Sequence, residues 1–89
     1  MKNLSLQITY RKGKPFAAYL YLPHGPGKKS VRCEELRPGL IVDFGEDGEP
    51  LGIEVISPSV TSIDELRQVF AGLGLEQPDA SDLQPLLAA

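Results

Sequence analysis

Apolar and polar residues alternate in five short stretches of the first 56 residues, which is the pattern of half-buried β-strands. The clearest stretch is LSLQITY, residues 4–10, where every second residue is apolar. The other four predicted strands are residues 16–22, 30–36, 40–44 and 51–56. Turns rich in Gly, Pro and Lys separate them. Because these connections are short, we expect sequential strands to pair in an antiparallel β-meander.

The last two predicted strands flank an acidic turn, GEDGEP, at residues 45–50. Asp47-Gly48 is a dipeptide typical of a tight chain reversal. Apolar runs lie on both sides of the turn, at residues 40–44 and 51–56. The segment 39–56 is therefore predicted to be a β-hairpin.

A helix is predicted from about Ser62 to Leu73, on the C-terminal side of the strands. Ser62 followed by Glu65 is a capping box, which satisfies free amide groups of the first turn. Its apolar residues recur every three or four positions and form one stripe: Ile63, Leu66, Val69, Phe70 and Leu73. Gly74 is placed to end the helix. We expect this one helix to cover the sheet, giving an α+β domain over residues 1–75.

Residues 76–89, EQPDASDLQPLLAA, are predicted to be a loosely ordered tail. Pro78 and Pro85 both interrupt a helix there. The apolar cluster of this tail is Leu83, Leu86 and Leu87. Such a tail either folds onto a groove of a partner or is an ordinary frayed chain end.

Composition fits one small domain, because 89 residues with 42% hydrophobic content are near the lower limit for a self-sufficient core. No apolar run approaches the roughly 20 residues that span a bilayer, and the first residues do not resemble a signal peptide. We therefore expect a cytoplasmic protein without membrane contact. Cys33 is the single cysteine, so an internal disulfide is impossible, and its position after Val31 predicts a small buried side chain.

Charge is divided unevenly between the two halves of the chain. Residues 1–40 hold eight Lys and Arg against two Glu, a sum of +6, and residues 41–89 hold one Arg against ten acids, a sum of −9. This division is compatible with head-to-tail self-association, with a nucleic-acid surface on the basic half, or with ordinary solvated strand faces. The basic residues lie mostly at turns and the whole chain is acidic, which makes nucleic-acid binding the minor hypothesis.

Three motifs of the chain partly match known sites of chemistry. Asp43, Asp47, Gly48 and Glu54 match positions 1, 5, 6 and 12 of a calcium-binding loop. Gly45, at position 3, supplies no side-chain oxygen as a ligand, and predicted strands flank the turn where a calcium loop has helices. GPGKKS, residues 25–30, resembles the end of a phosphate loop without its first glycine or its helix. His24 and Cys33 are the residue types that a Cys/His enzyme uses as base and nucleophile. None of these predicts catalytic, cofactor or metal residues, so we expect a non-enzyme.

A family resemblance is carried mainly by the turn and the closing strand. The residues concerned are Ile8, Thr9, Tyr10, Tyr19, Leu20, Glu34, Glu35, Leu36, Val42, Asp43, Phe44, Glu46, Asp47, Gly48, Leu51, Gly52, Ile53, Glu54 and Val55. Over about residues 6–57 the chain resembles a small bacterial family of domains of unknown function, numbered 2283. Its strand with Tyr, its Asp-rich turn and its closing Gly-Ile-Glu-Ile strand have counterparts here. The family's acids after the first Tyr and before the second strand are replaced by Arg11 and by residues 15–17.

The resemblance implies an antiparallel sheet with a C-terminal helix, and it implies an antitoxin or adaptor role. In this light Gly52 predicts a bulge or a close backbone approach, and Glu54 is expected on the face opposite Ile53, exposed or beside Arg32 or Arg37. Our leading hypothesis is an uncharacterised, non-catalytic protein-interaction or self-associating module, such as a homodimer. The alternatives are a small anionic or metal ligand held among Asp43, Asp47, Glu49 and Glu54 or beside His24 and Lys28, and weak nucleic-acid binding.

Overall fold

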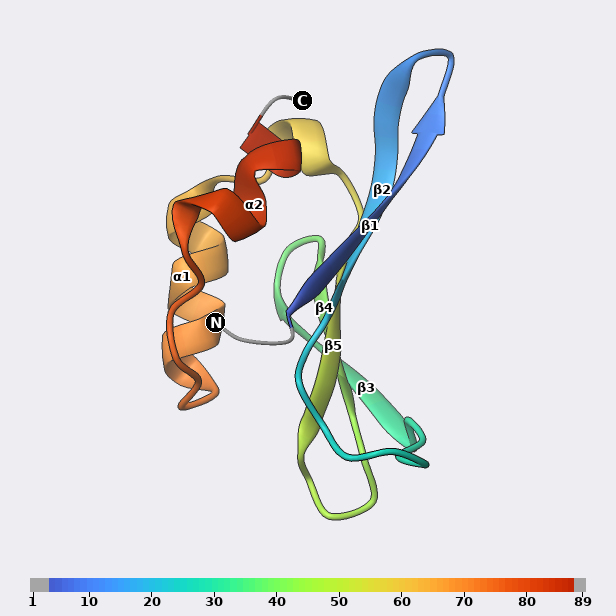
Figure 1. The fold of residues 1–89 in the computed structure, drawn as a ribbon, viewed down its shortest axis with the longest axis vertical. Coiled ribbons are helices and arrows are strands. Elements are labelled where there is room, and N and C mark those ends of the chain that lie inside the picture. The colour runs from blue at the N-terminus through green and yellow to red at the C-terminus, as the bar shows by residue number, and fades with distance from the viewer. Residues whose placement is uncertain (1–3, 88–89) are drawn as a thin grey trace.

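The five predicted strands are all present and form one antiparallel sheet in the computed structural model, which describes residues 4–87 (Figure 1). Their bounds are Ser5–Arg11 for β1, Lys14–Tyr21 for β2, Arg32–Arg37 for β3, Leu40–Phe44 for β4 and Pro50–Val55 for β5. The predicted hairpin of β4 and β5 is confirmed, and β1 and β2 pair antiparallel as expected for sequential strands. The α+β class is confirmed with them.

The order of the strands across the sheet differs from the predicted meander. The order is β1-β2-β5-β4-β3, so β2 pairs with β5 and β3 lies at an edge. In its register with β4, strand β3 has Arg32 and Glu34 opposite the buried Phe44 and Val42, so a central β3 would bury these two charges, which is costly. Strand β5 instead presents Leu51, Ile53 and Val55, which are all buried. The meander prediction was wrong because side-chain burial, and not connection length, selects the central strand.

The connection between β2 and β3 makes this order possible. Residues 22–31 cross beside the β4–β5 turn, near the lower end of the sheet in Figure 1, and reach the far edge. Backbone bonds fix both ends of this loop. The N–H of Leu22 donates to the carbonyl of Leu51 at 3.0 Å, and the N–H of Val31 donates to that of Phe44 at 2.9 Å. The Gly/Pro segment is thus a crossing loop and not a tight turn.

The predicted helix is present as α1, Ile63–Gly72, preceded by the short 3-10 helix η1, Pro58–Val60. The capping box is confirmed, because the N–H of Glu65 donates to Oγ of Ser62 at 3.1 Å and the Glu65 carboxylate accepts from the N–H of Ser62. Gly74, at φ +71°, follows the helix in the left-handed conformation. The stripe faces the sheet: Leu66, Val69 and Phe70 are buried, and Ile63 and Leu73 are partly buried.

The tail predicted to be loosely ordered contains a second helix, α2, Ala80–Leu87. Leu83 is fully buried and Leu86 nearly so, and both belong to the core cluster. Pro85 lies inside α2 and removes one helical hydrogen bond, at a cost of about 3 kcal/mol. Burying a leucine side chain contributes about 1.5–3 kcal/mol, so two of them offset that loss. The prediction of a single covering helix is corrected accordingly.

The core fills the space between the helices and one face of the sheet (Figure 1). Its members come from β2, β4, β5 and both α-helices, and it includes Leu22 of the crossing loop. Leu4, Leu6 and Ile8, on β1 or just before it, pack against this cluster while staying partly exposed. The helical layer therefore covers one side of the sheet. The strand side chains of the other side point away from the helices.

Candidate functional site

The surface considered for function is the side of the sheet that faces away from the helices (Figure 1). Side chains alternate along a strand, so residues between core positions point to this side. We call it the open face and define it by six residues on or next to the three central strands: Tyr19, Tyr21, Ile41, Asp43, Glu54 and Ile56. The predicted placement of Glu54 opposite Ile53 is confirmed.

Tyr19 lies over Gly52 at the middle of the open face. A Cβ atom built at Gly52 would overlap the ring and hydroxyl of Tyr19. The Tyr19 hydroxyl donates to Oδ2 of Asp43 at 2.6 Å, so one side chain of β2 crosses β5 and reaches β4. The close approach predicted at Gly52 is confirmed, although its partner is a ring and not a backbone. A register shift between Asp43 and Phe44 lies opposite the same strand.

The pKa of the Tyr19 hydroxyl is raised well above its ordinary value. Burial is the largest cause, followed by the hydrogen bond to Asp43 and by negative charges that include Asp43 and Glu54. The neutral hydroxyl is the form that can donate to a carboxylate. Tyr19 is therefore held as a hydrogen-bond donor, with its ring fixed over Gly52.

Tyr21 is the more accessible aromatic of the open face, with 44% of its surface exposed. Its ring meets that of Tyr19 edge to face, with centroids 4.7 Å apart. Its hydroxyl donates to Oε1 of Gln7 on β1 at 2.8 Å. Ile56, 43% exposed, and the partly exposed Ile41 add apolar area farther along the face. Two tyrosines held by hydrogen bonds thus present an ordered amphipathic surface.

Neither predicted basic neighbour of Glu54 occupies that position. In the strand register Glu54 lies between Tyr19 and Ile41. The guanidinium of Arg32 instead pairs with Glu34 at 3.2 Å and lies 4.1 Å from the Phe44 ring centroid. Among residues 4–87 no ion pair to Glu54 is present. The expected contact with Arg32 was wrong because β3 pairs with β4 and not with β5.

The four carboxylates of the ligand hypothesis are divided between two places. Asp43 and Glu54 face Tyr19 on the sheet, whereas Asp47 and Glu49 lie at the β4–β5 turn. There Lys28 Nζ is 2.8 Å from Asp47 and 3.2 Å from Glu49. The hydrogen bond from Lys28 is the main cause that lowers the pKa of Asp47. The described residues contain no group of three or more His, Cys, Asp or Glu that could hold a metal ion.

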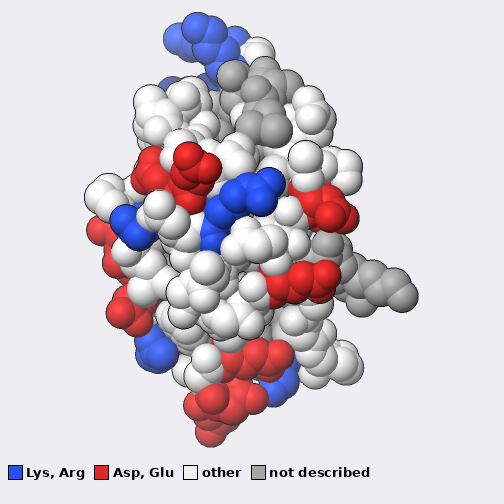
Figure 2. Space-filling view, turned by 90° about the vertical axis from the view of Figure 1, so that its left-hand side faces the viewer, with Lys and Arg blue, Asp and Glu red and all other residues white. Residues whose placement is uncertain are grey.

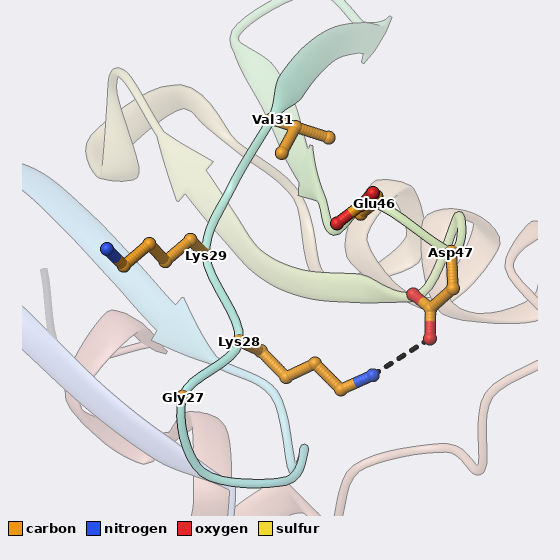
Figure 3. A pocket seen from close by; sticks show the side chains of 6 residues that line it. All are labelled: Gly27, Lys28, Lys29, Val31, Glu46 and Asp47. Atoms are coloured by element: carbon orange, nitrogen blue, oxygen red, sulfur yellow. Dashed lines mark hydrogen bonds and ion pairs between the residues drawn. The ribbon is translucent and has the colours of Figure 1, made fainter.

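An open cavity of about 590 Å³ lies beside this turn (Figure 3). It is lined by Gly27, Lys28, Lys29, Val31, Glu46 and Asp47. Lys28 extends to Asp47, while Lys29 points to the other side of the loop (Figure 3). A phosphate loop leads into a helix N-terminus, but this loop leads into β3. A phosphate here would also compete with the carboxylates that already bind Lys28.

His24 and Cys33 do not form a catalytic pair in the described part of the chain. The Nδ1 atom of His24 lies 2.9 Å from the carbonyl oxygen of Gly25, and the side chain is exposed. Cys33 is exposed on β3, opposite Asp43 in the register. The prediction of a buried Cys33 was wrong, because β3 is an edge strand whose six residues are all exposed.

The basic residues of the predicted turns lie at two separate places, the tip of the β1–β2 hairpin and the loop between β2 and β3. Arg11, Lys12 and Lys14 lie at the tip of the β1–β2 hairpin, at the top of Figure 1. They line a cavity of about 330 Å³ with Phe16, whose ring centroid is 5.5 Å from the Arg11 guanidinium. Lys28 lies with the acidic turn instead. Figure 2 shows cationic and acidic side chains interspersed over the helix-covered side, which does not favour a nucleic-acid groove.

Comparisons with known proteins give a match to a family model. Within residues 4–87 no helix is long and apolar enough to cross a membrane. No curated protein and no solved structure matches the chain. The matched family model covers residues 17–59, and this segment contains all six residues of the open face. The family whose model matches is described as a protein of unknown function (DUF2283), and the match confirms the resemblance that the turn and the closing strand predict.

Proposed function

We propose that this chain is a non-catalytic protein-interaction module that binds a partner through the open face. The observation that carries the proposal is the fixed pair Tyr19 and Tyr21 on a sheet face that lacks a helical cover. Rigid tyrosines contribute large amphipathic contact area at low entropic cost, and they are enriched in protein interfaces. An antitoxin or adaptor role, implied by the resemblance, is one form of this function.

The chemistry of the open face suggests what a partner would present. Tyr21, Ile41 and Ile56 offer exposed apolar area. Asp43 and Glu54 add negative charge next to Tyr19, which itself stays neutral. A matching surface combines apolar side chains with a Lys or Arg near its centre, where the guanidinium can also stack on a tyrosine ring.

The proposal is tested by capturing partners with the tagged full chain at physiological salt. Tyr21→Arg places a charge at the more accessible tyrosine of the open face and should abolish a stoichiometric partner, because buried tyrosines of an interface tolerate replacement poorly. Val60→Arg is the matched control. Val60 is 79% exposed in η1, on the helix side of the sheet, so this variant should retain the partner.

Thermal unfolding of both variants separates binding from folding. We expect melting temperatures within about 3 °C of the unsubstituted chain, because both positions are exposed and surface changes usually stay within about 0.5 kcal/mol. Equal capture by the unsubstituted chain and by a folded Tyr21→Arg variant would overturn the open-face assignment. Absence of any stoichiometric partner would overturn the interaction role itself.

A further inference from the structure

The two edge strands of the sheet differ in how they are protected against pairing with another chain. Strand β3, RCEELR, has four charged residues among six, and charged side chains are a common protection of a free edge. Strand β1, SLQITYR, is uncharged until its final residue. On an edge strand, alternate N–H and C=O groups point away from the sheet and are free to pair. The β1 edge is therefore the unprotected one.

The core is also incomplete at the β1 edge. Leu6 and Ile8 lie opposite Leu20 and Ala18 of β2, on the covered face. Leu20 and Ala18 are buried, whereas Leu6 and Ile8 are only partly buried. A further strand alongside β1 would extend the row of apolar residues and cover this remaining area.

The sequence of the β1 edge matches itself under two-fold symmetry. Its regular part is residues 5–9, SLQIT, because a register shift follows Thr9. The apolar pair Leu6 and Ile8 is equidistant from Gln7, and so is the polar pair Ser5 and Thr9. With an axis through Gln7, two antiparallel copies would place apolar opposite apolar and polar opposite polar, without opposing like charges.

We propose that two copies of this chain pair through their β1 edges, antiparallel and centred on Gln7, to form one continuous ten-stranded sheet. The contact is isologous, so each copy contributes the same patch. The side-chain oxygen Oε1 of Gln7 already accepts a hydrogen bond from the Tyr21 hydroxyl. The side-chain NH₂ group of Gln7 remains a donor for Gln7 of the second copy. This contact goes beyond the proposed function and uses a different surface, because the open face stays uncovered in the pair.

The expected affinity is moderate. Five paired residues span about 17 Å of strand edge. A contact this short buries less area than the roughly 800 Å² per partner of a standard stable interface. We therefore expect a dissociation constant in the micromolar range. Sedimentation of the full chain from about 5 to about 500 µM, under reducing conditions, should show conversion from monomer to dimer.

Charge variants test the proposed axis. Gln7→Lys and Gln7→Glu each place like charges opposite each other, and each should raise the dissociation constant roughly fivefold. An equimolar mixture of the two should restore the affinity, because opposite charges then face each other. Cys33→Lys is the matched control, since it adds the same charge on the exposed β3 edge and should leave dimerisation unchanged.

Disulfide trapping in a Cys33→Ser background tests the register. Gln7→Cys should cross-link with itself on mild oxidation, because directly opposed residues have Cα atoms about 4.5–5.5 Å apart, within disulfide range. Ser5→Cys should cross-link with Thr9→Cys and not with itself.

Three results would each overturn the proposal. They are a chain that stays monomeric at 500 µM, about a hundredfold above the lowest concentration, a dimer insensitive to Gln7→Lys, and failure of the Gln7→Cys cross-link. Loss of the dimer in Cys33→Lys would do the same. Partner capture through Tyr21 is scored separately, so the two proposals can fail independently.

Discussion

The two faces of the sheet hold their side chains in place by different means. On the covered face, burial among β2, β4, β5, α1 and α2 fixes residues such as Ile53 and Phe70, which have no exposed surface. On the open face, hydrogen bonds fix the side chains instead, from Tyr19 to Asp43 and from Tyr21 to Gln7. Burial contributes most of the stability of a small domain. The ordered open face can therefore change its contacts without unfolding the protein.

The largest expected effect comes from the covered face. Leu83→Ala should reduce the free energy of unfolding by about 2–5 kcal/mol, because it leaves a cavity beneath α2. Gln84→Ala, at the exposed neighbouring position, should change it by less than about 0.5 kcal/mol. Chemical denaturation measures both. A loss below about 1 kcal/mol for Leu83→Ala would show that α2 is not part of the core.

An intermediate effect is expected at Gly52, where the open face meets the backbone. Gly52→Ala should displace the Tyr19 ring, break its bond to Asp43 and cost about 1–3 kcal/mol. The same substitution in a Tyr19→Ala background should cost much less, since the obstructing ring is gone. A double-mutant cycle in denaturant measures this coupling. Equal costs in the two backgrounds would contradict the packing of Tyr19 over Gly52.

Alkaline pH should reveal the hydrogen bonding of Tyr19. Its folded-state pKa is raised, so the stabilisation is fully present below the unfolded value of about 10. Above that pH the unfolded chain loses the proton first, and stability falls as pH rises toward the folded pKa. The melting temperature should therefore drop more steeply above pH 10 (the unfolded value) for the unsubstituted chain than for Tyr19→Phe. Identical slopes would mean that burial and the bond to Asp43 do not raise the pKa of the Tyr19 hydroxyl in the folded chain.

The smallest effect is expected at the acidic turn. Lys28 and Asp47 are exposed, so Lys28→Gln should leave the melting temperature almost unchanged. It should raise the pKa of Asp47 toward its ordinary value, because the main cause of the lowering is removed. Carboxyl NMR titration of Asp47 between about pH 2 and 6 detects this shift. An unmoved pKa would exclude the ion pair in solution.

Local patterns predicted the elements of this fold well, because alternation, turn dipeptides and the capping box are encoded by neighbouring residues. The strand order was not predicted correctly, although the four charged residues of β3 indicate an edge strand. Helix α2 was not predicted, because Pro85 indicates a local helix break, whereas the burial of Leu83 depends on the rest of the fold. One feature of the open face, the close approach at Gly52, was predicted from the sequence. The position of Tyr19 over it joins residues 33 apart and depends on the β2–β5 pairing.

We propose that the covered face of the sheet maintains the fold and that the open face binds a partner. Isoleucine methyl NMR tests it most directly, because Ile41 and Ile56 lie on the open face, Ile53 in the core and Ile63 on α1. The captured partner is added to the methyl-labelled full chain. We predict signal changes at Ile41 and Ile56, with Ile53 and Ile63 unmoved. Changes at Ile63 without changes at Ile41 and Ile56 would place the partner on the helices and contradict the account.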